Sequence, residues 1–175
     1  MINETRKDNI ELLIKKIYNK FEKYFNSGEI IISGSNYYTK IGYPEEPSYN
    51  DIDIIIIDGR DDIFNEFIEY FDDGKNIIKT EVTDRIKGYD QLIGTIKTEY
   101  FYIDLFRDDF KNNLKSFEIL PGIFTDYHCN EKFVEIYTQF VEWTKKEGGE
   151  IDKKYTPKYS KLLKFFKENN EYKKR

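Results

Sequence analysis

The most informative stretch of this chain is Asp51-Ile52-Asp53-Ile54-Ile55-Ile56-Ile57. Its β-branched side chains and its short length favour a buried β-strand over a helix. Side chains two residues apart on a strand point to the same face, so Asp51 and Asp53 present carboxylates about 6 to 7 Å apart along the chain. Paired carboxylates at the start of a buried strand are typical of a divalent-metal site.

A Gly-Ser pair lies upstream of this strand, within Ile32-Ser33-Gly34-Ser35. Residues 29–33 predict a short buried strand that ends at the glycine. A glycine lets the backbone approach a phosphate closely, and a serine hydroxyl adds a donor. A helical turn opening at Asn36 would also aim its N–H groups at an anion. The pair is therefore a candidate triphosphate-binding site.

A third acid, Asp104, interrupts the apolar and aromatic stretch Tyr100–Phe106. An unpaired charge inside such a strand is costly unless a cation lies beside it. We expect Asp104 to lie on a strand next to Asp51 and Asp53 and to complete their metal site. Two ions about 3.5 to 4 Å apart can clamp the attacking and leaving oxygens of a nucleotidyl transfer.

Apolar periodicity and turn residues predict the remaining elements. Helices are expected over 9–25, over 61–71 with Asp61 or Asp62 as the cap, from Asn130 to Gly148, and from Thr156-Pro157 onward; strands over 29–33, 51–57, 77–82, 91–97 and 100–106, the last two as a hairpin. This order predicts an α/β (α+β) fold, with a mixed, mostly antiparallel sheet backed by helices. We expect a catalytic core over 1–120 and a short helical C-terminal part over 121–175.

Charge is unevenly distributed along the 175 residues. The chain has 28 Lys and Arg against 33 Asp and Glu, a net charge of −5, which argues against a protein whose whole surface coats nucleic acid. Residues 150–175 alone carry nine basic and four acidic side chains, which makes a basic tail. The tail is expected to be either a solvated helix face or a docking surface.

The His and Cys content limits the kinds of metal ligand, and the apolar stretches and the first residues indicate where the protein is located. With one His and one Cys, a His-rich or Cys-rich zinc site within one copy is excluded, so any metal must be held by oxygen ligands. No apolar stretch approaches the roughly 18 to 20 residues that span a bilayer, and the first residues do not resemble a signal peptide. We expect a soluble, cytoplasmic protein with no membrane partner.

The order Gly-Ser, Asp-x-Asp and a later strand acid resembles the nucleotidyltransferase superfamily, which includes polymerase-β-like enzymes, antibiotic nucleotidyltransferases and minimal nucleotidyltransferases of toxin systems. The resemblance runs from the first helix through the strand with Asp104. It implies that Gly34 and Ser35 hold nucleotide phosphates, that Asp51 and Asp53 ligate Mg²⁺ or Mn²⁺, and that Asp104 is the third ligand or assists deprotonation of the acceptor.

The resemblance has one departure near the Gly-Ser pair. Many members place an Arg there, whereas Lys40 is the only nearby cation in this chain and is expected to bind the nucleotide. The implied activity is transfer of a nucleoside monophosphate from a nucleoside triphosphate such as ATP to an acceptor hydroxyl, with release of pyrophosphate. The acceptor stays open between a small molecule, a protein and RNA. Two other interpretations are a catalytically inactive binding or assembly module and a metal-dependent glycosyltransferase that uses Asp51 and Asp53.

Overall fold

The computed structural model of this chain describes residues 2–45, 49–58, 60–86, 90–108, 114–128 and 130–168. Within these ranges it describes the side chains of all residues except 2–4, 35, 36, 83–86, 90, 108, 114–117, 126–128 and 130. The residues expected to carry the site lie in this part of the chain, except for the side chain of Ser35.

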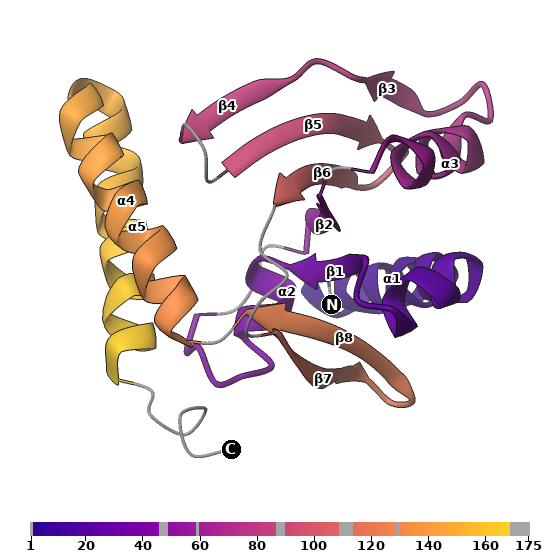
Figure 1. Cartoon of the computed structure of the whole chain (residues 1–175), viewed down its shortest axis with the longest axis horizontal. Coiled ribbons are helices and arrows are strands. Elements are labelled where there is room, and N and C mark those ends of the chain that lie inside the picture. The colour runs from indigo at the N-terminus through magenta and orange to yellow at the C-terminus, as the bar shows by residue number, and fades with distance from the viewer. Residues whose placement is uncertain are drawn as a thin grey trace.

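The main sheet is mixed and mostly antiparallel, as the sequence predicted (Figure 1). Its strand order is β1 (Ile30–Ser33), β2 (Asp51–Ile57), β6 (Tyr102–Asp108), β5 (Asp90–Lys97) and β3 (Ile77–Lys79), with β4 (Thr83–Ile86) also paired to β5. Only the β2–β6 pair is parallel among these pairings. The expected hairpin of residues 91–97 and 100–106 is confirmed as β5–β6, whereas the single strand expected over 77–82 is wrong, because β3 ends at Lys79.

One face of the sheet is covered by α1 (Ile2–Asn26) and α3 (Asp61–Phe71) (Figure 1). The apolar side chains of both helices recur every three or four residues and so form one stripe each, which packs on the sheet. Every second residue of the strands points toward these two helices. The fully buried ones are Ile52, Ile54, Ile56, Ile96, Ile103 and Leu105. Both predicted helices are confirmed, and α1 begins earlier than expected.

The expected cap of α3 is wrong. The N-cap residue is Arg60, and Asp61 and Asp62 lie inside the first turn. Arg60 donates hydrogen bonds to Asp62, at 2.6 Å, and to Glu29. The Arg60 guanidinium therefore lowers the pKa of the Asp62 carboxyl. The two aspartates still suit this position, because negative charge in the first turn complements the helix dipole.

A two-stranded sheet that the sequence analysis did not predict lies beside β1. It consists of β7 (Leu114–Leu120) and β8 (Ile123–His128), joined by a turn at Pro121-Gly122. The hydroxyl of Thr125 on β8 is buried and accepts the backbone N–H of Ile32 at 2.9 Å, which ties this hairpin to β1. The boundary expected between residues 120 and 121 falls at the turn of the hairpin.

The helical C-terminal part consists of α4 (Asn130–Glu147) and α5 (Gly149–Glu168), which pack side by side (Figure 1). The helix expected from Asn130 is confirmed. The helix start expected at Thr156-Pro157 is wrong, because α5 begins at Gly149 and Pro157 lies inside it. Pro157 has no backbone N–H and so cannot make one of the hydrogen bonds of the helix, and the packing of α5 against α4 offsets this loss of stability. One contact between the two helices lies next to the proline, where the buried Thr144 hydroxyl is 2.6 Å from that of Thr156.

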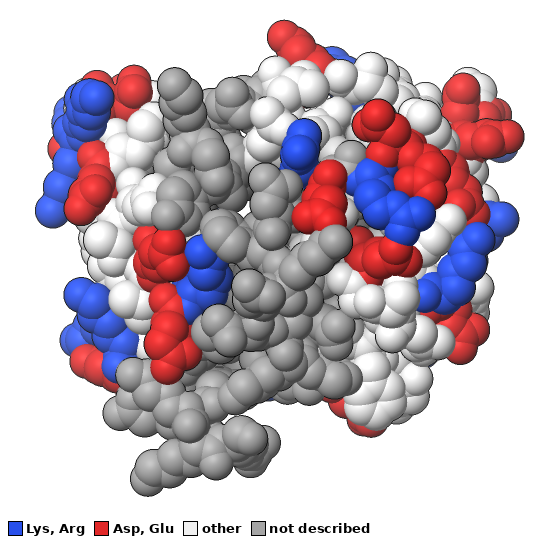
Figure 2. All heavy atoms as spheres, in the orientation of Figure 1, with Lys and Arg blue, Asp and Glu red and all other residues white. Residues whose placement is uncertain are grey.

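Basic and acidic side chains alternate over α4 and α5 on the face shown in Figure 2. Lys153 lies 3.7 Å from Glu150, and Lys161 lies 3.0 Å from Glu45 in the segment after α2 (Ser35–Tyr38). The described part of the basic tail is therefore a face of mixed charge, and residues 169–175 lie outside the described part. Among the described helices, none has an apolar stretch that would cross a bilayer.

Candidate metal site

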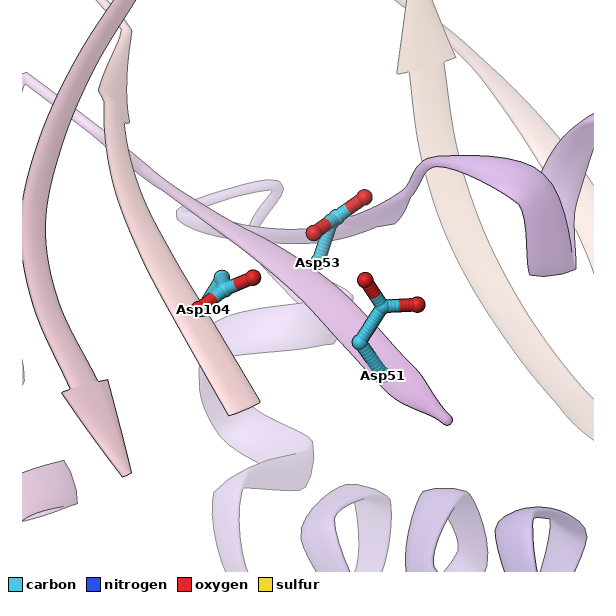
Figure 3. A group of neighbouring side chains, drawn as sticks. All are labelled: Asp51, Asp53 and Asp104. Atoms are coloured by element: carbon cyan, nitrogen blue, oxygen red, sulfur yellow. The ribbon is translucent and has the colours of Figure 1, made fainter. Parts of the chain in front are cut away.

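Three carboxylates meet on the face of the sheet opposite α1 and α3 (Figure 3). Asp51 and Asp53 come from β2, and Asp104 comes from β6. The parallel register pairs Asp53 with Asp104, so their side chains stand next to each other on one face. One carboxylate oxygen of each residue lies within 4.8 Å of the other two, and all three side chains are half-buried.

The burial of β2 explains why the acids lie where they do. Beyond Asp53 both faces of the strand are buried, because Ile55 and Ile57 pack with Ile31 and Phe106 on the acidic face. A strand buried on both faces appears in the sequence as a continuous apolar run. The acids occupy the end of β2 where the acidic face opens to solvent.

Asn50 holds this open end of β2 in place. Its carbonyl oxygen accepts the backbone N–H of Tyr102 at 2.9 Å, which fixes the start of the β2–β6 pairing. Its side-chain oxygen accepts a hydrogen bond from Arg6 of α1 at 3.1 Å. The position of Asp51 is therefore set by contacts with both a strand and a helix.

Thr95 is a site residue that the sequence analysis missed. Its hydroxyl donates to Oδ1 of Asp104 at 3.1 Å, and the two residues are cross-strand partners in the β5–β6 hairpin. Such a bond orients a carboxylate beside a metal site. The expected strands over 91–97 and 100–106 would have placed Ile93 opposite Asp104, whereas the observed register pairs Lys97 with Tyr102 and so brings Thr95 opposite Asp104.

Gly34 makes room for the carboxylate of Asp53. Its φ is +75°, a backbone conformation that favours glycine. A Cβ atom placed on it would lie 2.0 Å from Oδ2 of Asp53. The position of the Asp53 carboxylate is therefore sufficient to explain why residue 34 is a glycine. Close approach of a phosphate to Gly34 stays a prediction.

Two tyrosine hydroxyls join the segment after Gly34 to α4. The hydroxyl of Tyr38 in α2 lies 2.6 Å from that of Tyr137 in α4, and both residues are buried. Burial, then Tyr38, and more weakly Tyr159 and Asp53 raise the pKa of Tyr137 well above its ordinary value. Tyr137 therefore lies close enough to Asp53 for the charge of that carboxylate to contribute to its pKa shift.

We expect loss of this hydroxyl pair to destabilise the protein. Tyr137→Phe leaves the Tyr38 hydroxyl without that partner in a buried setting, which costs about 1 to 3 kcal/mol in the free energy of unfolding. The double variant Tyr38→Phe/Tyr137→Phe should lose less than the sum of the single variants, because both ends of one bond are then removed. Urea denaturation measures all three.

The matched control is Tyr100→Phe, because the Tyr100 side chain is 68% exposed. Loss of that hydroxyl should change the free energy of unfolding by no more than about 0.5 kcal/mol. Strictly additive effects of the Tyr38 and Tyr137 substitutions would show that the two hydroxyls do not depend on each other.

The two other residues expected to bind the nucleotide are placed differently. Lys40 is exposed and lines a pocket of about 210 Å³ together with Lys7 and Glu11 of α1, and none of the three aspartates lines this pocket. The side chain of Ser35 lies outside the described part of the chain, although its backbone begins α2. Nucleotide binding by Lys40 and Ser35 stays a prediction.

The donor set fits a hard divalent cation. Two oxygens that share one Mg²⁺ at about 2.0 to 2.1 Å lie at most about 4.2 Å apart, so oxygens within 4.8 Å need only a small approach to share an ion. Carboxylate ligands suit Mg²⁺ or Mn²⁺. In comparisons with known proteins, no family model and no curated protein matches this chain, so its function has to be inferred from these residues.

Proposed function

We propose that this protein is a metal-dependent nucleotidyltransferase, which moves a nucleoside monophosphate from a nucleoside triphosphate such as ATP to an acceptor hydroxyl and releases pyrophosphate. The observation that carries the proposal is the convergence of Asp51, Asp53 and Asp104 from two adjacent strands, with one oxygen of each within 4.8 Å of the others. Partial exposure of all three supports it, because a substrate can then reach them.

The three aspartates would hold Mg²⁺ or Mn²⁺, with Asp104 as the third ligand. Divalent ions bound there would neutralise charge on the triphosphate and orient the attacking and leaving oxygens. The protein's own part is to keep the carboxylates in place before substrate arrives. The β2–β6 register and the hydrogen bond from Thr95 to Asp104 support this preorganisation.

The proposed transfer is a single displacement at the α-phosphorus of the triphosphate. The acceptor hydroxyl oxygen forms a bond to the α-phosphorus, and the bond from that phosphorus to the oxygen bridging the β-phosphate breaks. Pyrophosphate leaves with that electron pair. The hydroxyl proton passes to solvent, or to Asp104 if this carboxylate acts as the base instead of the third ligand.

The first test is binding, because it needs no acceptor. Electron paramagnetic resonance should detect Mn²⁺ bound to the protein, and a non-hydrolysable triphosphate analogue should bind more tightly when Mg²⁺ or Mn²⁺ is present. Chelation by EDTA should abolish this difference. Triphosphate binding that does not depend on metal would contradict the proposal.

The second test is product formation. We expect pyrophosphate release from at least one of the common nucleoside triphosphates when candidate acceptors, RNA and small hydroxyl compounds among them, are added with Mg²⁺. Release of a nucleoside diphosphate from a nucleotide sugar would indicate a glycosyltransferase instead. Metal-dependent triphosphate binding without any product would indicate the catalytically inactive module.

A further inference from the structure

The sheet face that carries the aspartates continues past β6 onto β5 and β3 (Figure 1). Cross-strand partners share a face, and the register pairs Tyr102 with both Asp51 and Lys97, and Lys97 with Ile77. Lys79 pairs with Thr95, the partner of Asp104. Tyr102, Lys97, Ile77 and Lys79 therefore stand on the same face as the metal site, and we name these four residues the β6–β3 surface.

The β6–β3 surface is open to solvent. Tyr102 is 45% exposed and Ile77 is 56% exposed, although large hydrophobic side chains such as these are usually buried. Both lysines are exposed, and Nζ of Lys97 lies 5.8 Å from the centre of the Tyr102 ring. The Tyr102 ring, with the Lys97 ammonium group beside it, thus lies next to the carboxylates, and Lys79 lies on the same face of the sheet.

The strand order places Gly34 and the β6–β3 surface on opposite sides of the aspartates. Gly34 follows β1, which pairs with one edge of β2, while Tyr102 lies on β6, which pairs with the other edge. In a displacement at phosphorus the attacking and leaving oxygens lie roughly in line. A triphosphate on the Gly34 side would therefore be attacked from the side of β6.

We propose that the β6–β3 surface binds the acceptor, and that this acceptor carries phosphate groups and a planar base, as a nucleotide or the end of a single-stranded polynucleotide does. This inference rests on the proposed function. A base can stack on an exposed tyrosine ring whatever its identity, and lysines pair with phosphates. Two lysines also disfavour an acceptor that is itself a polycation, because like charges repel.

The geometry gives Tyr102 and the two lysines of the surface separate tasks. Tyr102 lies next to Asp51, so a base stacked on it would bring the attached sugar hydroxyl toward the carboxylates. Lys97 and Lys79 lie further from β2, on the next two strands, and would hold phosphates that trail away from the reacting end. Tyr102 is a positioning residue, and the lysines select for acceptor charge.

The test is equilibrium binding of a fluorescein-labelled, eight-nucleotide single-stranded RNA, measured by anisotropy without metal or triphosphate. Wild-type protein should bind it, and Lys97→Glu should weaken binding at least about tenfold and reduce the slope of log affinity against log salt by about one. Tyr102→Ala should weaken binding about tenfold, and Tyr102→Phe should retain it, because stacking needs the ring and not the hydroxyl.

The matched control is Lys20→Glu, which makes the same charge change at an exposed lysine of α1. It should bind the RNA nearly as well as wild type. An equal loss in Lys20→Glu and Lys97→Glu would overturn the proposal, because the effect would then be one of net charge. Failure of RNA, DNA of the same sequence and uridine monophosphate to bind would overturn it as well.

The arms of the experiment identify the acceptor and keep the two proposals apart. Binding of RNA or DNA indicates a polynucleotide end, and binding of uridine monophosphate alone indicates a mononucleotide. Lys97→Glu should leave metal-dependent binding of the triphosphate analogue unchanged. If the analogue binds with metal but no nucleotide acceptor binds, the acceptor proposal fails alone; if metal and analogue do not bind, the proposed function fails.

Discussion

Asp53→Asn should lower pyrophosphate release at least about a hundredfold, the loss typical of removing a key electrostatic group from a reaction centre. The amide keeps the shape of the side chain but removes one of three charges that would hold the metal. Binding of Mn²⁺ should weaken in parallel. The folded protein should be as stable as wild type or steadier, because without metal the three carboxylates repel one another.

A matched control for Asp53→Asn is Asp72→Asn, at an exposed aspartate that ends α3 and is not part of the metal site. It should leave both turnover and Mn²⁺ binding unchanged. Normal turnover of Asp53→Asn with Mg²⁺ would rule out a metal-based reaction at this site. Unfolding of Asp53→Asn in the absence of metal would make Asp53 a structural residue.

Gly34→Ala should strongly lower both the stability and the activity of the protein. The added Cβ would lie 2.0 Å from Oδ2 of Asp53, so the carboxylate or the backbone must move. The positive φ adds about 1 to 2 kcal/mol and overpacking adds about 1 to 3 kcal/mol, so the free energy of unfolding should fall by about 2 to 5 kcal/mol. A shift of Asp53 by about 1 Å is enough to lower turnover about a hundredfold.

Gly122→Ala separates the two causes. Gly122 has the same φ of +75°, in the turn between β7 and β8, but a Cβ there would meet no atom within 4 Å. It should cost only the backbone penalty of about 1 to 2 kcal/mol and leave turnover unchanged. Thermal or urea denaturation and the pyrophosphate assay measure both variants. Equal effects in Gly34→Ala and Gly122→Ala would show that contact with Asp53 is unimportant.

Local signals in the sequence were enough for most elements of the fold. The predicted strand over 51–57 is confirmed residue by residue, because dense β-branched side chains favour an extended backbone wherever the strand is placed. The helices over 9–25 and 61–71 are confirmed for a similar reason. Apolar residues spaced three or four apart lie on one face only when the backbone is an α-helix, and that face can then be buried.

The missed hairpin and the misplaced start of α5 depend on contacts with other elements of the fold. The β7–β8 hairpin adjoins β1, and the Thr125 hydroxyl accepts a backbone N–H that belongs to β1, a pairing that no local pattern encodes. Pro157 predicted a helix start because proline lacks a backbone donor. Contact between α4 and α5 outweighs that local preference, so the helix continues through it.

Local sequence patterns identified the side chains that could form the site. Alternation along one strand places Asp51 and Asp53 on a common face, and an acid in the apolar stretch around Asp104 requires a compensating partner. That these acids meet depends on the parallel register of β2 and β6, which sets Asp53 beside Asp104, and the contact of Gly34 with Asp53 likewise depends on the packing of distant segments. The physical reason is that strand pairing between distant segments is fixed by burial of a whole face, and a slip of one residue would turn Asp104 toward the helices.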